Sequence, residues 1–326
     1  MIGPDHPGDQ IIIKKALLQN FMSHYKAVCS RSHGGRPVVR AWRLLAVAAF
    51  KSPGKARARR ARGLVLRRVL LTALAGVLFL WALPQHAKAY DIGYTVPYTI
   101  TGTLPHDPGA FTQGLVLKDG VFYESTGLYG QSSLRKVDPA TGKTLARASL
   151  DPSLFGEGLA WWKGQLYQLT WKSGIVLLHD AKTLAQTGTL PLESDGWGAT
   201  ATPAGIVTSD GSDTLSWRDP LTFRPLRTVR VTDQGLPVRL LNALAWGDGV
   251  LFANVWHQDR IAVISPLSGQ VIGWIDGSKL RALAGSPPGE SDLNGLAWDP
   301  VKKRLYVTGK LWPKIFELSL ERFSKS

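Results

Sequence analysis

Cysteine is almost absent from this sequence. The only one is Cys29, and residues 90–326 contain none. The larger part of the chain therefore has no disulfide bond, no thiolate nucleophile and no cysteine-bound zinc. Histidine is also scarce there, because only His106, His179 and His257 occur, far apart and without the spacing of metal ligands. We expect no metal site and no cofactor.

Familiar motifs for nucleophilic catalysis and phosphate binding are missing as well. No G-x-S-x-G sequence is present, and the glycines at 127–130 do not join a strand to a helix. The segment SDGSD at 209–213 resembles a calcium loop only loosely and lacks the terminal acid. We interpret it as a solvent-exposed turn.

Acidic residues are rare in the first 89 positions, which hold 16 Lys and Arg against 2 Asp and Glu, a net charge of +14. Residues 90–326 hold 23 against 22, a net charge of +1. Nearly all of the overall charge of +15 therefore comes from the N-terminal part. A nucleic-acid-binding domain would carry its basic surface on the folded region, so we expect no nucleic-acid partner.

The longest apolar run is short. Residues 69–83 are 15 uncharged positions, whereas a span across a bilayer needs about 20. A basic stretch at 55–68 precedes this run, and 84–89 end in a small-x-small pattern, which is the order found in signal peptides. We expect cleavage after Ala89 and a periplasmic or secreted product, with a retained membrane anchor as the alternative.

These features divide the chain into three parts. Residues 1–62 show no sustained periodicity and are interpreted as a basic, disordered extension upstream of the true start. Residues 63–89 form the signal peptide or membrane anchor. Residues 90–326 form one domain, expected to be a monomer that contacts a membrane only through an uncleaved signal segment.

An internal repeat dominates residues 90–326. Five similar units can be aligned, and their anchor positions are separated by 44, 40, 45 and 52 residues. Each unit consists of a short apolar strand, a turn such as KDG or WKG, a second strand, and outer segments of alternating polarity. This period, without a helical pattern, is typical of a propeller with one blade per unit. The anchors are Gly114, Gly158, Gly198, Ala243 and Gly295.

The fifth unit lacks its last strand, because only KIFELSLERF remains before the chain ends. Residues 94–105 form an extended run without a repeat partner, so we expect them to supply the missing strand and close the ring. Closure removes an exposed sheet edge that would otherwise favour aggregation. The predicted fold is an all-β, five-bladed β-propeller closed by an N-terminal strand.

Repeat-equivalent residues should meet at one mouth of the central channel, because the first strand of each blade runs nearest the axis. The second strand of each blade runs back to the same mouth, so residues at its end should form a second ring there. Units one and three contribute Thr126 and Gly211 to this second ring. The first ring is Gln113, Glu157, Trp197, Asn242 and Asn294, and the second supplies Trp171, Trp256 and Lys310.

This combination has a chemical interpretation. A lone carboxylate among indole rings is partly desolvated, which raises its pKa, so Glu157 is the candidate acid and base. Lys310 offers positive charge to a developing oxyanion, while Asn242 and Gln113 can bind amide groups. The tryptophans form an apolar wall. Alternatively, the polar residues only hold water in the channel and the tryptophans only pack.

Several motifs resemble one family along residues 95–320. They include FTQGL, STGLYGQSSLRKVD, FGEGLA, LYQLTWKSG, LFANVW and LNGLAWDP. They are similar to those of the plant and bacterial type of glutaminyl-peptide cyclotransferase, also called glutamine cyclotransferase. The resemblance implies a five-bladed propeller and an acyltransferase that converts the N-terminal glutamine of peptides to pyroglutamate and releases ammonia. It also implies that Glu157 is the acid and base and that the other ring residues line the substrate pocket.

We therefore expect catalytic roles for Glu157 and Lys310. The expected substrate-binding residues are Gln113, Trp171, Trp197, Asn242, Trp256 and Asn294. The implied reaction is intramolecular and needs no cofactor, and its partners are peptides or proteins with N-terminal glutamine. Two rival functions are a non-enzymatic ligand-binding propeller of the cell envelope and a lactonase-like hydrolase, although the latter gathers several carboxylates around calcium.

One departure from the family pattern concerns the fourth unit. Relatives usually have two acids in a sequence similar to LNELEW, whereas this chain has LNALAW, with Ala243 and Ala245. Any support that those acids give to a metal or to a contact between blades in relatives is therefore absent here. The retained Asn242 leaves the expected activity in place.

Overall fold

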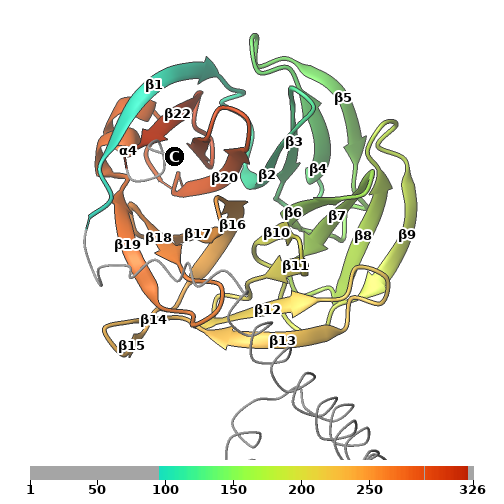
Figure 1. The fold of residues 1–326 in the computed structure, drawn as a ribbon. Coiled ribbons are helices and arrows are strands. Elements are labelled where there is room, and N and C mark those ends of the chain that lie inside the picture. Colours follow the sequence, from blue (N-terminus) through green and yellow to red (C-terminus); the bar gives the residue numbers. More distant parts are fainter. Residues whose placement is uncertain (1–94, 290, 322–326) are drawn as a thin grey trace, which may run out of the picture. The chain divides into compact units, whose positions relative to one another are not determined.

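Five four-stranded antiparallel sheets surround a common axis in the computed structural model (Figure 1). The structure describes residues 95–289 and 291–321. The predicted extension, the signal segment and the cleavage after Ala89 lie outside these residues. No helix in the described ranges is long and apolar enough to cross a membrane.

The sheets follow the repeat units, so the five blades predicted from the sequence are confirmed. Blade 1 contains β2 (Thr112–Lys118), β3 (Val121–Thr126), β4 (Ser133–Val137) and β5 (Thr144–Ser149). Blade 2 contains β6 (Gly156–Trp162), β7 (Gln165–Thr170), β8 (Ile175–Asp180) and β9 (Gln186–Pro191). Blade 3 contains β10 (Ala199–Thr202), β11 (Gly205–Thr208), β12 (Thr214–Arg218) and β13 (Pro225–Arg230).

Blade 4 contains β16 (Leu241–Gly247), β17 (Val250–Val255), β18 (Arg260–Ile264) and β19 (Val271–Asp276). Blade 5 combines both ends of the domain: β20 (Leu293–Asp299), β21 (Arg304–Gly309), β22 (Lys314–Leu320) and β1 (Tyr98–Pro105). Strand β1 pairs antiparallel with β22, from Tyr98 opposite Leu320 to Pro105 opposite Lys314. The expected closing strand is therefore confirmed, and it covers the edge that β22 would otherwise expose.

Two-residue turns explain three of the inner hairpins. The turns Asp119–Gly120, Lys163–Gly164 and Asp248–Gly249 have positive φ at both residues, from 48° to 88°. Positive φ at both central positions is the geometry whose twist matches that of antiparallel strands, and glycine adopts it without steric cost. The turn sequences KDG, WKG and GDG therefore correctly indicate these hairpins.

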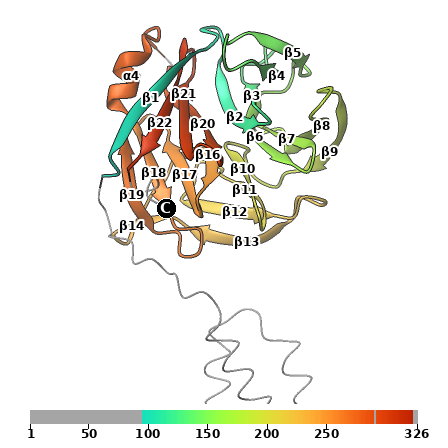
Figure 2. The same ribbon diagram turned by 45° about the horizontal axis from the view of Figure 1, so that its top comes forward.

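Two insertions depart from the regular blade pattern. A small hairpin, β14 (Thr232–Asp233) and β15 (Leu236–Pro237), follows blade 3, and helix α4 (Ser278–Ala284) lies between β19 and β20. Figure 2 shows α4 beside β1 at one rim of the ring. The sequence pattern does not predict this helix, because seven residues are too short for a helical period, but the helix lies within the longest interval between repeat units.

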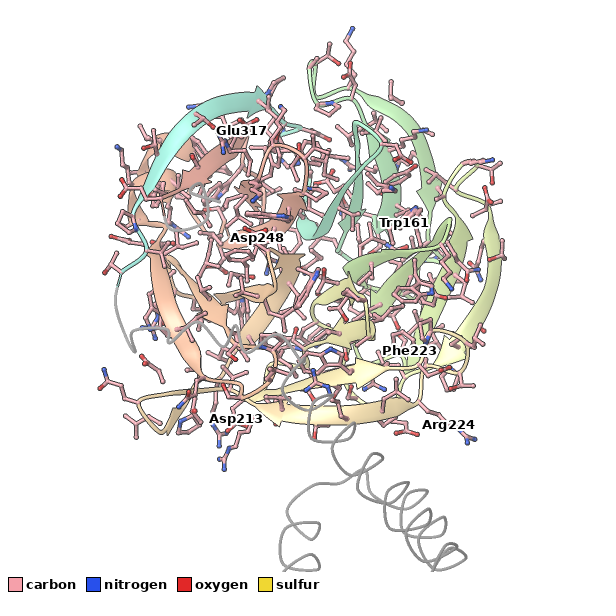
Figure 3. The ribbon with its side chains drawn as sticks, viewed as in Figure 1. Trp161, Asp213, Phe223, Arg224, Asp248 and Glu317 are labelled. Carbon is pink, nitrogen blue, oxygen red and sulfur yellow. The ribbon has the colours of Figure 1, made fainter. Side chains whose placement is uncertain are left out.

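Apolar side chains fill the space between neighbouring sheets (Figure 3). Phe223, in the turn between β12 and β13, is 1% exposed and stacks on Tyr167 of blade 2 with ring centroids 6.1 Å apart. Near the axis the inner strands come so close that a side chain cannot fit. A Cβ on Gly158 would lie 2.5 Å from the backbone nitrogen of Ala199 in blade 3. This contact explains why a glycine is one of the repeat anchors.

Candidate active site

A cavity of about 310 Å³ opens at the mouth where the inner strands begin. It brings together seven of the eight residues expected to act in catalysis or substrate binding; Thr126 and Gly211, the other two ring positions, are not among the described residues that line it. Its lining consists of Phe111, Gln113, Leu128, Phe155, Glu157, Trp171, Trp197, Asn242, Trp256 and Lys310. A second cavity, of about 320 Å³, opens near Trp161 and Asp248, which Figure 3 labels; none of the eight predicted residues is among the described residues that line it.

A β-bulge accompanies the ring residue in four of the five inner strands. In blade 2, Gly156 pairs with Thr170 but Leu159 pairs with Gln168, so β6 contains one more residue than its partner at Glu157 and Gly158. The registers of β2, β16 and β20 shift in the same way around Gln113, Asn242 and Asn294. Bulges redirect side chains and are common beside active sites. The period of the repeat does not reveal them.

Glu157 is the only acid among the described residues that line this cavity, and it is 6% exposed. Its Oε1 accepts a hydrogen bond from Nε2 of Gln113 across 3.3 Å, while its Oε2 is buried without a hydrogen-bond partner in the described part of the chain. Burial raises the pKa of Glu157 well above its usual value, Lys310 opposes that rise, and Asp195 adds to it. A carboxyl in this environment holds its proton at pH values where an exposed one has lost it.

Lys310 brings positive charge to the same cavity. It is 5% exposed, and its Nζ lies 4.9 Å from the ring centre of Phe111 and 5.5 Å from that of Trp256. The backbone nitrogen of Lys310 donates to the carbonyl of Asp292 across 3.0 Å. The ammonium group is therefore held between two aromatic faces, which attract cations.

The aromatic wall is held by ring contacts and by one carboxylate. The rings of Trp197 and Trp256 meet edge to face at 5.3 Å. Nε1 of Trp256 donates to Oδ2 of Asp292 across 3.0 Å. By contrast, Nε1 of Trp197 and Oδ1 of Asn242 are buried without hydrogen-bond partners in the described ranges. Both side chains line the cavity, and these two atoms, one donor and one acceptor, are left unsatisfied by the described residues.

Asn294 differs from the prediction. It is fully buried and does not line the cavity. Its Nδ2 donates to Oε1 of Gln113 across 2.6 Å and to the carbonyl of Thr112 across 3.1 Å, so its NH₂ group is occupied by the protein, while its Oδ1 is buried without a hydrogen-bond partner in the described ranges. Asn294 therefore lies behind Gln113 rather than beside the ligand space.

Three residues of the lining, Phe111, Leu128 and Phe155, were not predicted from the sequence. Both phenylalanines precede a ring residue by two positions, so the repeat alignment contained a signal for them. Leu128 has no such signal, because it is placed by a loop in which its φ is 85°. Phe155 also contacts Trp171, with ring centroids 5.7 Å apart, and so extends the aromatic wall.

Metal-ligating residues do not gather within the described residues, where no group of three or more His, Cys, Asp or Glu could hold an ion. In the 209–213 segment, Asp213 pairs with Arg230 at 2.8 Å. Ala243 and Ala245 are both buried in the hydrophobic core cluster between blades 4 and 5. The cavity therefore presents one carboxyl, one ammonium, amide groups and indoles.

Comparisons with known proteins agree with this fold. The family model for glutamine cyclotransferase matches residues 72–320. A protein of Arabidopsis thaliana named glutaminyl-peptide cyclotransferase is 38% identical over 265 residues, which cover 78% of this chain and 83% of that protein. The crystal structure of Myxococcus xanthus glutaminyl cyclase matches with a TM-score of 0.66 and 36% identity, over 71% of this chain and 98% of that chain. This chain therefore belongs to the glutamine cyclotransferase family.

Proposed function

We propose that this protein is a glutaminyl-peptide cyclotransferase that converts the N-terminal glutamine of peptides and proteins to pyroglutamate and releases ammonia. Its family and the names of its two relatives support the reaction class. The observation that carries the mechanism is the placement of one desolvated carboxyl, Glu157, in the same cavity as Lys310.

The cavity suits an intramolecular reaction. The α-amine of the substrate attacks the γ-amide carbon of the same residue, so the enzyme must fold one side chain into a reactive shape rather than bring two molecules together. A space of about 310 Å³ with indole walls restricts that side chain. Oδ1 of Asn242 can accept a hydrogen bond from the substrate amine or amide, and Nε1 of Trp197 can donate one.

Glu157 transfers a proton between the attacking α-nitrogen and the departing amide nitrogen. As the α-nitrogen bonds to the side-chain carbonyl carbon, Cδ, it loses one proton; as the bond from Cδ to the amide nitrogen breaks, that nitrogen gains one and leaves as ammonia. Glu157 protonates the departing nitrogen and recovers the proton of the attacking amine, so its own protonation state is restored. Its raised pKa supports this role, because the carboxyl must hold a proton at working pH.

Lys310 stabilises the oxygen of the former amide carbonyl as negative charge develops on it. A buried ammonium is effective there because few waters screen it. Its place between the rings of Phe111 and Trp256 also limits its motion. We further propose that no metal takes part, since one carboxyl and one ammonium can supply both the proton transfer and the charge stabilisation.

The test uses purified protein and a short peptide that begins with glutamine. We expect equal amounts of ammonia and pyroglutamyl peptide, and no product from the same peptide with an acetylated amine, because the nucleophile is then blocked. Activity should persist in excess chelator. Binding of the glutamine peptide without ammonia release would instead indicate a non-enzymatic propeller, and chelator-sensitive activity that added metal restores would overturn the metal-free mechanism.

The cellular setting follows from the sequence. We propose that the protein is periplasmic or secreted after cleavage at Ala89 and that it acts as a monomer on peptides or proteins with N-terminal glutamine. N-terminal sequencing of the mature protein tests the cleavage, and a start before Tyr90 would contradict it.

A further inference from the structure

The hydrogen-bond network behind Glu157 determines which way the amide of Gln113 faces. The carbonyl oxygen of Thr112 can only accept, so Asn294 must direct its NH₂ group to it across 3.1 Å. The same NH₂ group contacts Gln113 at 2.6 Å, so the atom of Gln113 on that side must be its oxygen. The NH₂ group of Gln113 consequently faces Glu157 and can only donate to it.

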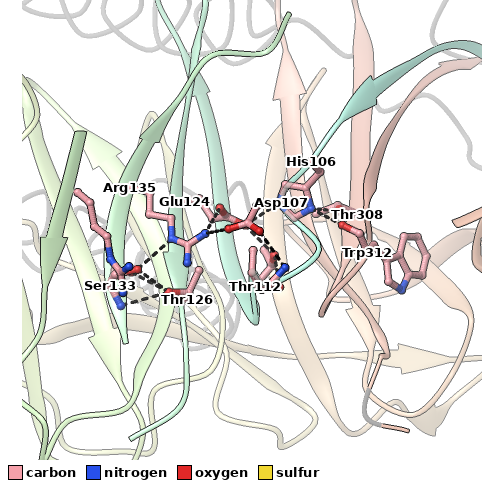
Figure 4. Close-up of polar contacts among 12 residues, drawn as sticks. His106, Asp107, Thr112, Glu124, Thr126, Ser133, Arg135, Thr308 and Trp312 are labelled. Carbon is pink, nitrogen blue, oxygen red and sulfur yellow. Dashed lines mark hydrogen bonds and ion pairs between the residues drawn. The ribbon is translucent and has the colours of Figure 1, made fainter. Parts of the chain in front are cut away.

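Thr112 is itself held by a buried charged cluster at the junction of blades 1 and 5, drawn in Figure 4. Its hydroxyl donates to Oε1 of Glu124 across 2.7 Å, and Nε2 of His106 lies 2.8 Å from the same oxygen. Nδ1 of His106 lies 2.6 Å from the carbonyl of Trp312, which can only accept. Nδ1 therefore donates, and Nε2 donates as well when His106 is protonated, a form that the Glu124 carboxylate favours by raising the pKa of His106 against the effect of burial.

Arg135 completes this cluster. Its Nη1 lies 4.0 Å from Oε2 of Glu124 and donates to Oδ2 of Asp107 across 2.7 Å. The two cations keep Glu124 ionised in spite of its complete burial, and its pKa is lowered by them. An ionised carboxylate accepts hydrogen bonds only, so the hydroxyl of Thr112 has a fixed direction. The strand start that carries Thr112 and Gln113 is therefore anchored independently of any ligand.

We propose that Asn294 and Gln113 are positioning residues: the amide of Asn294 holds Gln113 so that it only donates to Oε1 of Glu157, and the carboxyl proton of Glu157 is therefore carried by Oε2. Oε2 is the oxygen without a hydrogen-bond partner in the described ranges. The charged groups that act on Glu157 are Lys310 and Asp195. The role of this arrangement in catalysis rests on the proposed cyclisation. The direction of the hydrogen bonds from Asn294 to Gln113 and from Gln113 to Glu157 does not.

The substitution Asn294→Asp tests this proposal by reversing the direction of the hydrogen bond between residue 294 and Gln113. It keeps the shape of the side chain but replaces the NH₂ group by an acceptor. Gln113 then turns its NH₂ group towards residue 294 and its oxygen towards Glu157, which loses a donor that favours the ionised form. We expect the protonation midpoint of Glu157 to move up by about one pH unit or more. The new carboxylate of Asn294→Asp also raises this midpoint by its charge, so the uncharged variant Asn294→Ser, which is too short to reach Gln113, decides the test and should move the midpoint in the same direction.

The midpoint is measured in the free enzyme by infrared titration of the protonated carboxyl band that disappears in Glu157→Gln. With a glutamine peptide, at a pH below the midpoints of all the proteins so that Glu157 is protonated in each, both Asn294 variants should lower kcat about tenfold with little change in KM, because the proton is no longer held on one oxygen. Asn242→Ser, at the repeat-equivalent lining position, should mainly raise KM. An unchanged or lowered midpoint in folded Asn294 variants overturns the inference, as does a change confined to KM. If the wild type does not cyclise the peptide but the midpoint shifts, the proposed function fails and the positioning role stands.

Discussion

Nε2 of Gln113 and Oε1 of Glu157 are 3.3 Å apart, although the two residues belong to neighbouring blades and are repeat-equivalent positions 44 residues apart. The hydrogen bond ties the inner strand of blade 1 to that of blade 2 at the cavity mouth. It leaves the acid buried beside Lys310 and close to Asp195. This buried position of Glu157 affects both the pH dependence of turnover and the stability of the fold.

The pH dependence of turnover should show the raised pKa of Glu157. The acid must be protonated to supply the leaving nitrogen, so kcat should fall about tenfold per pH unit above the pKa of Glu157 in the complex. Steady-state kinetics from pH 5 to pH 10 measure this alkaline limb, which must lie well above the usual carboxyl range near 4.5. A profile that stays flat from neutral to strongly alkaline pH would contradict the role of Glu157 as the acid.

Stability should also depend on this acid. Because folding raises the pKa of Glu157, the native state binds the proton more tightly than the unfolded state, and stability falls as pH rises from 4.5 through the folded pKa. Glu157→Gln removes this loss of stability, because the amide does not ionise. The variant should therefore unfold at a higher temperature than the wild type at pH 8, with the difference shrinking towards pH 4. If the wild type and the variant had equal melting temperatures at both pH values, burial of Glu157 would not destabilise its ionised form.

His179 should make the protein sensitive to acid. It is 3% exposed, its Nε2 is buried without a hydrogen-bond partner in the described ranges, and burial lowers its pKa below 6.5. The unfolded chain therefore takes up a proton first, so stability is complete above pH 6.5 and is lost as pH falls towards the folded pKa. Each pKa unit of separation costs about 1.4 kcal/mol.

Comparison with His179→Asn isolates this effect from other groups, such as His106, whose raised pKa acts in the opposite direction. Urea unfolding at pH 7.5 and pH 5 should show that the wild type loses more stability than the variant on acidification. An equal loss of stability in both proteins would show that His179 does not cause the sensitivity to acid.

Close approach of the inner strands predicts a steep cost at Gly158. In Gly158→Ala the new Cβ would meet three backbone atoms of blade 3 at 2.5–2.6 Å, which cannot move away cheaply. We expect at least about 2 kcal/mol of destabilisation, or a fall in Tm of roughly 4–8 °C. Gly188→Ala is the matched control, because its Cβ would meet only one side-chain atom, at 3.8 Å. Equal thermal melts for the two variants would contradict this packing.

Repetition made much of the fold predictable. Five copies of one hairpin, with positive-φ turns such as Asp119–Gly120, imply five blades without knowledge of any long-range contact. Equivalence between copies then brings Glu157, Trp256 and Lys310 to one mouth. The missing strand of the fifth unit predicted the pairing of β1 with β22, since an open edge had to be covered.

Features that exist in only one blade could not be predicted in this way. The His106–Glu124 pair joins the start of the domain to blade 1, and no local pattern marks it. The burial of Asn294 depends on a bulge in β20 and on the acceptors that meet its amide, which the repeat position alone does not specify. Helix α4 fits between two blades without a periodic signal because it is shorter than two full helical turns.

Ammonia release by wild-type protein and by Glu157→Gln, from the same glutamine peptide, tests the central claim most directly. The variant keeps the size of the side chain and can still accept the hydrogen bond from Gln113, so its fold should be retained by circular dichroism. If Glu157 is the acid and base, kcat should fall by about 10²–10⁴-fold. A folded Glu157→Gln protein that releases ammonia within a few-fold of the wild-type rate would contradict the proposed mechanism.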